Sequence, residues 1–437
     1  MYRGLLALLL GVFLVQMDST MVNIALETLI GAFHADLATI QWVSTSYLLA
    51  MAAMIPVAGW AVDRFGDRAA WLSSLALFTL GSLLCGLAWS APSLIAARVV
   101  QGLGGGLMMP LFQTIVARRA GGRPLGRVMA VIGVPLLLGP VLGPVLGGAL
   151  VDGPGWRAIF LVNLPICAVA AWAAARALPA SSAAQPPRPD MLGLALLCPA
   201  LVGLVWGRPF STLLGGLLLA LFIAHALRAP APAVDLRLFR SRDFTAASLL
   251  MLLAMVALLG TILLIPLYYQ QVHGFTPLHA GLLLAPSGIG SALSLTYAGR
   301  LITHFGVRPV AVTGALLLTA VAVAFTQLTA ATSPWTLGAL VALSGLGFGA
   351  VLVTAQSRVY GGLPRASVPH ATTAVRVFQQ VGGSLGVAVL ASSWQRNAPA
   401  FGHTFWWAAG ASALALGPAL MFRSSPQPAP APTEVTA

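Results

Sequence analysis

The chain has 437 residues, of which 58% are apolar and only 8% charged, and its mean hydropathy is +0.91. A soluble domain carries about 25% charged residues to cover its core, so this composition excludes a soluble enzyme, a disordered chain and a disulfide scaffold. All 23 basic residues are arginine, against 10 acidic residues, which gives a net charge of +13. The chain therefore lacks the lysine of P-loop and Schiff-base enzymes.

Fourteen apolar segments follow one another along the chain, and most are close to or above the roughly 20 residues that one membrane span requires. They predict an all-α integral membrane protein with 14 transmembrane helices. The first does not resemble a cleaved signal peptide, because it carries Asp18 in its middle and has no clear cleavage site. The segments are 5–33, 42–62, 69–90, 93–117, 125–151, 157–178, 191–207, 209–227, 245–270, 278–299, 309–328, 334–357, 370–393 and 402–422.

The arginines lie mostly on one side of this predicted topology. Eighteen of the 23 fall on the side that holds both termini, three fall on the opposite side, and Arg98 and Arg376 lie inside spans. Such a bias predicts that both termini are cytoplasmic, in a multi-pass inner or plasma membrane protein. The net charge then reflects topology and not nucleic-acid binding.

Three glycine-containing signatures recur at nearly constant offsets. Residues 59–68 resemble 299–308, 102–106 resemble 345–349, and 143–147 resemble 382–386, at offsets of 240, 243 and 239. This repeat predicts two pseudo-symmetric six-helix bundles, 1–178 and 245–422. A linker at 179–244 contains two extra helices at about 191–207 and 209–227, and residues 423–437 form a disordered cytoplasmic tail. Parallel halves of this kind are typical of secondary transporters with a site between them.

Two charged residues inside the first half are candidates for proton coupling. Asp18 lies near the middle of the first span and Arg98 inside the fourth. A carboxylate at that depth is costly unless it pairs, faces a cavity or binds a proton, so Asp18 suits proton exchange. The alternatives are a static ion pair between the two residues, or an arginine that binds backbone carbonyls.

Two polar stripes predict a substrate cavity. Gln101, Gly102, Gly105 and Met109 follow Arg98 on one helix face, and Gln379, Gln380 and Gly383 follow Arg376 on another. Arg376 could contact an anionic substrate or bond a neighbouring helix. The expected cavity residues are Asn23, Gln101, Met109, Tyr268, Arg376, Gln379, Gln380 and Glu27.

Glu27 is ambiguous, because nine residues of helix place it on the face opposite Asp18. It either has a solvated or interhelical role at the outer end of its span or attracts cations there.

Two further motifs predict segments that take part in conformational change. The loop 59–68 carries Gly59, Asp63, Arg64, Gly66 and Arg68 and is either a cytoplasmic gate built on an ion pair or a plain topology signal. The fifth span carries Gly143, Pro144, Gly147 and Gly148, which favour a bent and closely packed helix.

These motifs resemble the fourteen-helix drug:proton antiporter branch of the major facilitator superfamily. The matching segments are 18–26 (DSTMVNIAL), 59–68, 98–102 (RVVQG), 143–148 (GPVLGG) and 156–165. The resemblance implies a proton-coupled exporter of amphiphilic drugs that works by alternating access. Glu27 stands where that branch has proline, Asp67 where it has a basic residue, and Thr303-His304 where the repeated loop would have Asp-Arg.

Two alternatives to drug export stay open at this stage. One is a dedicated exporter of a single metabolite or lipid, and the other is a non-transporting membrane sensor or scaffold. The seven histidines show no ligand spacing, the three cysteines are not paired, and no catalytic motif is present. We therefore expect no enzyme activity, metal or cofactor, and a monomer whose partners are protons, lipid and small amphiphiles.

Overall fold

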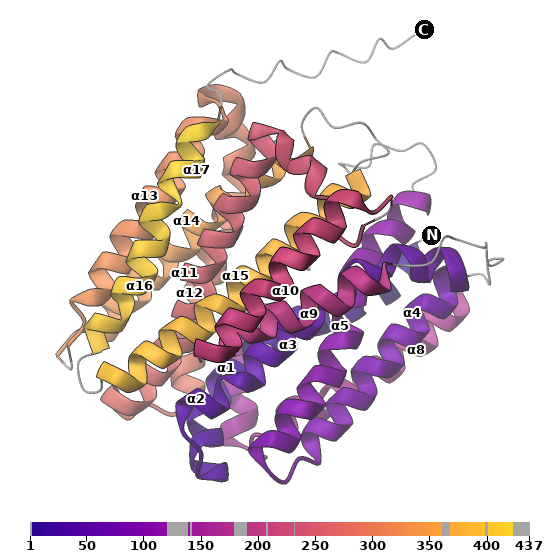
Figure 1. The fold of residues 1–437 in the computed structure, drawn as a ribbon. Helices are drawn as coiled ribbons and strands as arrows, with labels where there is room; N and C mark the ends of the chain where they lie inside the picture. The colour runs from indigo at the N-terminus through magenta and orange to yellow at the C-terminus, as the bar shows by residue number, and fades with distance from the viewer. Residues whose placement is uncertain are drawn as a thin grey trace, which may run out of the picture.

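A computed structural model of the chain describes residues 2–119, 139, 142–178, 190–206, 209–230, 232–329, 331–360, 368–397 and 401–422. Within these ranges the molecule consists of helices and the turns between them, with no strand. The helices stand side by side in two groups, one formed by each end of the chain (Figure 1). The predicted tail 423–437 and most of the break at 179–190 lie outside the described residues.

The first group contains the helices from residue 2 to residue 177. They are α1 (Tyr2–Phe33), α2 (Leu37–Ile40), α3 (Trp42–Met54), α4 (Val57–Gly86), α5 (Ala91–Arg119), the short apolar helix Leu142–Asp152, α7 (Ala158–Leu161) and α8 (Asn163–Ala177). In Figure 1 this group is indigo to purple, and α2 marks one end of the molecule, which we call the α2 end.

The second group contains the helices from residue 242 onward. They are α11 (Arg242–His273), α12 (Pro277–Phe305), α13 (Val307–Thr326), α14 (Pro334–Tyr360), α15 (Val368–Asn397), α16 (Phe401–Leu414) and α17 (Leu416–Met421). The sequence sets their ends: Ser241 accepts a hydrogen bond from the N–H of Phe244 at the start of α11, and Gly274 ends that helix in the left-handed conformation.

The helices are long and apolar enough to cross a membrane many times. Eleven stretches of the described chain meet that criterion by length and composition, and the helices Leu142–Asp152 and Met191–Trp206 are shorter. Each of the 14 predicted segments overlaps a described helix. The protein is therefore a multi-pass membrane protein, and the number of 14 spans stays a prediction.

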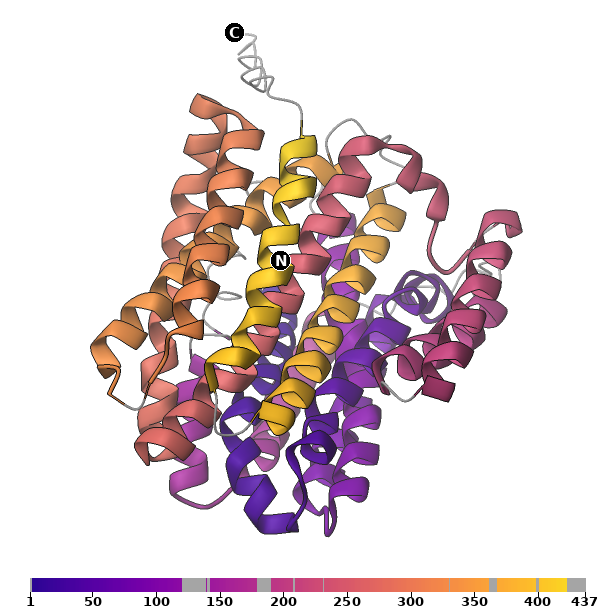
Figure 2. The ribbon, with the colours of Figure 1, turned by 60° about the vertical axis from the view of Figure 1, so that its left-hand side comes forward.

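Two inserted helices lie against both groups. α9 (Met191–Trp206) and α10 (Pro209–Arg228) pack on each other, and α9 also contacts α3 and α15. The rings of Trp42 and Trp206 meet edge to face at 5.8 Å. Figure 2 shows the α9–α10 pair at the periphery of the molecule.

Asp190 holds the start of this inserted pair. Its carboxylate accepts hydrogen bonds from the N–H groups of Gly193 (2.8 Å) and Ala233 (3.0 Å) and contacts His225 Nε2 at 2.7 Å. Burial raises the pKa of this carboxyl, but the three hydrogen bonds outweigh burial and hold the pKa of Asp190 below its ordinary value. The carboxylate joins α9, the end of α10 and the segment that follows.

The predicted loop at 59–68 is a sharp break and not an open loop. α4 runs through the segment and is interrupted at Gly66, where φ is 79° and ψ is 165°. Gly306, 240 residues later, joins α12 to α13 with φ 89° and ψ 167°. Only glycine adopts this conformation without strain, so the repeated motif produces the same backbone break twice.

Replacing Gly66 with alanine is expected to destabilise the protein, because its backbone conformation is essentially restricted to glycine. Strain of this kind costs about 1–3 kcal/mol, so the melting temperature of the purified protein in detergent should fall. Gly59→Ala is the matched control, since Gly59 is an exposed helical residue of the same motif with nothing within 4 Å of an added Cβ. Equal melting temperatures for the two variants would contradict this account of Gly66.

Candidate functional site

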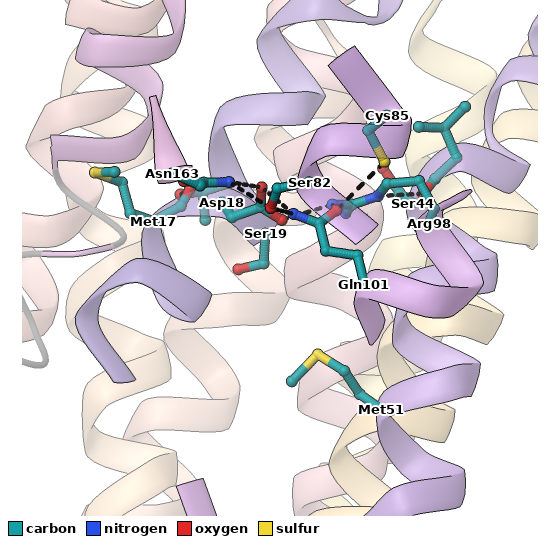
Figure 3. Close-up of polar contacts among 12 residues, drawn as sticks. Met17, Asp18, Ser19, Ser44, Met51, Ser82, Cys85, Arg98, Gln101 and Asn163 are labelled. Atoms are coloured by element: carbon teal, nitrogen blue, oxygen red, sulfur yellow. Dashed lines mark hydrogen bonds and ion pairs between the residues drawn. The ribbon is translucent and has the colours of Figure 1, made fainter. Parts of the chain in front are cut away.

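An ion pair between Asp18 and Arg98 lies in the middle of the first helix group. Arg98 Nη1 lies 2.5 Å from Asp18 Oδ2, and both side chains are almost completely buried. Asp18 comes from α1 and Arg98 from α5, so the pair joins two helices that are 80 residues apart in sequence. Figure 3 shows the two side chains meeting among polar residues from neighbouring helices.

Two amides complete the hydrogen bonding of the carboxylate. Gln101 Nε2 donates to Asp18 Oδ1 at 2.9 Å, and Asn163 Nδ2 donates to the same oxygen at 2.8 Å. Both amides also donate to Ser82 Oγ, at 2.8 and 3.3 Å. The Oε1 atom of Gln101 accepts from Arg98 Nη1 at 2.6 Å. Asp18 thus accepts three hydrogen bonds from three side chains.

The guanidinium is held by a third helix. Arg98 Nε donates to the backbone carbonyl of Val43 in α3 at 3.0 Å, and the ring of Tyr47 lies 3.9 Å from the Arg98 Cζ atom. A cation over an aromatic face at this distance is attracted to it, most strongly where water is excluded. Residues of α1, α3, α4, α5 and α8 therefore converge on one buried cluster.

The hydrogen bonds of this cluster fit an ionised Asp18. An ionised carboxylate only accepts hydrogen bonds, whereas a protonated carboxyl must donate one. All three groups that bond Asp18 act as donors, so a proton on Asp18 would find no acceptor among these bonds. A proton on Asp18 would also remove the negative charge that balances the buried Arg98.

Glycine allows the helices to approach this cluster. A Cβ on Gly102 would collide with Tyr47 in α3, and a Cβ on Gly81 would collide with the backbone of Gln101. The helical stripe predicted from Arg98 onward is thus a packing surface on its glycine side and a polar surface on its Gln101 side. Met109, farther along the same helix, is partly exposed.

The second predicted stripe lies on α15 at the seam between the two groups. Arg376 Nη1 donates to Gln379 Oε1 at 3.2 Å, and Gln380 Nε2 lies 3.7 Å from the sulfur of Met51 in α3. A Cβ on Gly383 would collide with Leu259 of α11 and would lie 3.5 Å from Leu48 of α3. This face of α15 is therefore turned toward α3.

The remaining predicted cavity residues form hydrogen bonds with partners on different helices or turns. Asn23 Oδ1 accepts a hydrogen bond from Ser44 Oγ at 3.0 Å within the first group. Tyr268 is buried in the second group and donates to the carbonyl of Thr329 at 2.6 Å. Glu27 Oε2 accepts from Gln271 Nε2 of α11 at 2.5 Å, which is an interhelical contact near the α2 end. These three side chains thus bond three different partners.

Further contacts join the two groups near the α2 end. Gln270 Nε2 donates to the carbonyl of Ile24 at 3.1 Å, and the N–H of Leu278 at the start of α12 donates to Asp152 Oδ2 at 3.0 Å. Together with Glu27 and Gln271, they bind the first group to the second at this end.

The glycine–proline helix is packed between both groups. Added Cβ atoms on Gly143 and Gly147 would collide with Thr20 and Met21 of α1, and one on Gly148 would collide with α12. Pro144 in turn contacts Gly281 of α12. A helix in such close contact with both groups is suited to an interface at which they move.

The gate residues surround the break at Gly66. Arg64 is exposed, Asp63 and Arg68 are partly buried, and Asp67 is buried with 8% exposure. In the second group Arg358 of α14 pairs with Asp243 of α11 at 3.3 Å, a contact that the sequence analysis did not anticipate.

Sequence reasoning did not assign Ser82, Tyr47 or Asn163 to the Asp18 cluster. Each is a polar residue inside an apolar segment, and such residues need partners in a membrane, which is the signal that could have identified them. In the part of the chain that the structure describes, no group of three His, Cys, Asp or Glu side chains could hold a metal ion.

The sequence matches a family profile over residues 8–387, and that profile is the Major Facilitator Superfamily. The chain belongs to the Major Facilitator Superfamily. It is a transporter-family protein and not an enzyme. The nucleoside transporter NupG and a D-xylose-proton symporter share this fold, each with a TM-score of 0.71, at 13% and 16% identity over at least 96% of both chains.

Curated members of the superfamily with similar sequences are drug-resistance proteins. A multidrug resistance protein B homolog of Mycobacterium tuberculosis is 37% identical over 392 residues, which is 86% of this chain and 73% of that protein. A tetracenomycin C resistance and export protein of Streptomyces glaucescens is 33% identical over 88% of this chain and 74% of its own length. The predicted membership of the superfamily is confirmed. The expected similarity to multidrug-resistance proteins is also found.

Removing Arg98 alone should destabilise the protein strongly, because the Asp18 charge would stay buried without its partner. Breaking a buried pair in this way costs about 3–5 kcal/mol, whereas replacing both partners with apolar residues is often neutral. We expect Arg98→Met to lower the melting temperature in detergent and the double variant Asp18→Leu/Arg98→Met to recover most of the loss. A double variant as unstable as Arg98→Met would show that the two charges do not balance each other.

Proposed function

We propose that this protein is a proton-coupled antiporter that exports amphiphilic drugs or toxic compounds from the cell. The observation that carries the proposal is the buried Asp18–Arg98 pair in a chain whose relatives are drug-resistance transporters. Asp18 is the group that would bind and release the proton. A charge that moves down 100 mV yields about 2.3 kcal/mol, which is an adequate source for uphill export.

The proposed cycle is alternating access by two pseudo-symmetric halves, 1–178 and 245–422. The repeated glycine break at Gly66 and Gly306 supports this symmetry. The contacts of Glu27 and Asp152 with the second group support a state that is closed at the α2 end. Protonation of Asp18 would loosen its hold on α5 and α8 and so bias the rocking of the first half.

The arginine distribution supports the orientation. With 18 of 23 arginines on the side of the termini, that side is proposed to be cytoplasmic and the α2 end to face outward, in the cell membrane. Export then releases substrate at the α2 end while a proton enters from it.

Asp18→Asn should abolish proton-driven export and leave the protein folded, because an amide has the same volume but cannot carry a proton. The measurement is uphill movement of a fluorescent amphiphile in proteoliposomes with an imposed pH gradient. Asp235→Asn is the control, since it removes one carboxylate outside the apolar segments. Wild-type uphill transport by a folded Asp18→Asn protein would rule out Asp18 as the coupling site.

Weakening the contacts at the α2 end should populate a state that is open there. Spin labels at the exposed positions 89 and 335 would report the separation of the two halves. Asp152→Ala and Gln271→Ala each remove a charge-assisted bond of about 1.5–3 kcal/mol, enough for a tenfold or larger shift. Thr276→Ala, which removes a bond within the second half, is the control. An unchanged distance distribution in both test variants would refute a closing role for these contacts.

A further inference from the structure

The chain is strongly basic where α10 is joined to α11. Residues 228–242, which we call the α10–α11 junction, contain four arginines and one acidic residue, Asp235. Arg228 is the last residue of α10 and Arg242 is the first of α11, and both helices are long and apolar enough to cross a membrane. The 13 residues between them (229–241) are too few for another membrane span, so the whole junction lies at one membrane surface.

The apolar side of the junction is packed against the second group. Its short helix is η1 (Leu236–Arg240). The ring of Phe239 in η1 meets that of Phe244 in α11 at 5.1 Å and that of Phe378 in α15 at 5.2 Å. The carbonyl of Phe239 also accepts a hydrogen bond from Thr245 Oγ1 at 2.7 Å. The junction is thus a folded surface with a fixed place on α11 and α15.

All four arginines of the junction are exposed: Arg228, Arg237, Arg240 and Arg242. The carboxylate of Asp235 accepts a hydrogen bond from the N–H of Arg237 at 3.0 Å and so caps the start of η1. In the part of the chain that the structure describes, no carboxylate forms an ion pair with Arg228, Arg240 or Arg242. Three guanidinium groups at this membrane surface are therefore available to an anionic ligand.

The carboxylates that adjoin or contact the junction have other partners. Asp243, which directly follows the junction, pairs with Arg358 of α14 at 3.3 Å. Asp190 accepts a hydrogen bond from the N–H of Ala233 inside the junction and lies 2.7 Å from His225 Nε2. The junction therefore carries an excess of positive charge where the membrane helices end.

Anionic phospholipids are the ligands that fit this surface. Their phosphate groups lie at the level where membrane helices end, and clusters of arginine beside such helices attract them. A guanidinium can donate to two phosphate oxygens at once, which makes arginine well suited to phosphate. We propose that the α10–α11 junction binds the headgroup of an anionic phospholipid, with Arg228, Arg240 and Arg242 as its phosphate-binding residues.

A lipid bound in this way connects the inserted helices to the second group. It contacts the end of α10 through Arg228 and the start of α11 through Arg242, and η1 packs on both helices. Lipid binding should therefore stabilise the packing of the α9–α10 pair on the rest of the protein. The inference uses the membrane location of the chain and not the proposed export function, so either can fail without the other.

Two lipids with the same acyl chains and different headgroup charge provide the test. Dioleoylphosphatidylglycerol is anionic and dioleoylphosphatidylcholine is zwitterionic, and each would be titrated into the purified full-length protein in a nonionic detergent. Native mass spectrometry at fixed ionic strength would measure the fraction of protein with one bound lipid. Wild type would be compared with the test variant Arg240→Gln/Arg242→Gln and the control variant Arg176→Gln/Arg300→Gln. The control removes the same charge from two exposed arginines of α8 and α12.

We expect wild type and the control variant to bind phosphatidylglycerol with at least about tenfold higher affinity than the test variant. Phosphatidylcholine should bind all three proteins equally and more weakly. Equal phosphatidylglycerol affinity in wild type and the folded test variant would overturn the proposal. An equal loss in both double variants would also overturn it, because it would show an effect of net charge alone. Inorganic phosphate that displaces phosphatidylglycerol at equal concentration would assign the site to free phosphate and overturn the lipid.

Melting temperatures distinguish loss of the lipid site from loss of the fold. Arg240 and Arg242 are exposed and form no ion pair, so the lipid-free test variant should melt at the wild-type temperature. Phosphatidylglycerol should raise the melting temperature of wild type more than that of the test variant. Arg228→Gln is a second test variant, on the other helix, and it should weaken phosphatidylglycerol binding about fivefold. Wild-type lipid affinity in both Arg228→Gln and the double variant would exclude this site.

Discussion

The burial of one ion pair constrains the whole first half of this transporter. Asp18 and Arg98 are completely buried, so each charge needs its partner and further hydrogen bonds. Those bonds come from side chains of α4, α5 and α8 and from the backbone of α3. Five helices are therefore held in one arrangement by a single carboxylate and its cation, and a change in the charge of either group affects all five.

Close helix packing around the pair depends on glycine. The α5 stripe and the glycine–proline helix both place backbone where a side chain would collide with a neighbour. Such contacts are made through van der Waals packing, which is the main attraction between helices in a lipid environment.

The two halves divide the chemistry unequally. The first half carries the buried charges, whereas the corresponding region of the second half is a cavity lined by residues such as Leu258 and Val341. The polar face of α15 stands between them at the seam with α3.

The sequence by itself determined the class of the molecule, its helices and its most informative residues. Composition and periodicity suffice for this, because a membrane span must be apolar over its whole length and an ionisable residue inside it is conspicuous. Asp18, Arg98 and Gln101 were identified in this way, and they do lie in one cluster. The motif at 59–68 contains the break at Gly66, but the sequence did not predict that one helix runs on both sides of it.

Only the tertiary structure decided which distant residues meet. Asn163 binds Asp18 across 145 residues of sequence, and Glu27 binds Gln271 across 244, and neither contact follows from any local pattern. It also separated Tyr268, whose hydroxyl is bonded inside the second group, from Arg376 at the seam. Helical periodicity fixes the face on which a side chain lies, but the neighbour of that face depends on how all the helices pack together.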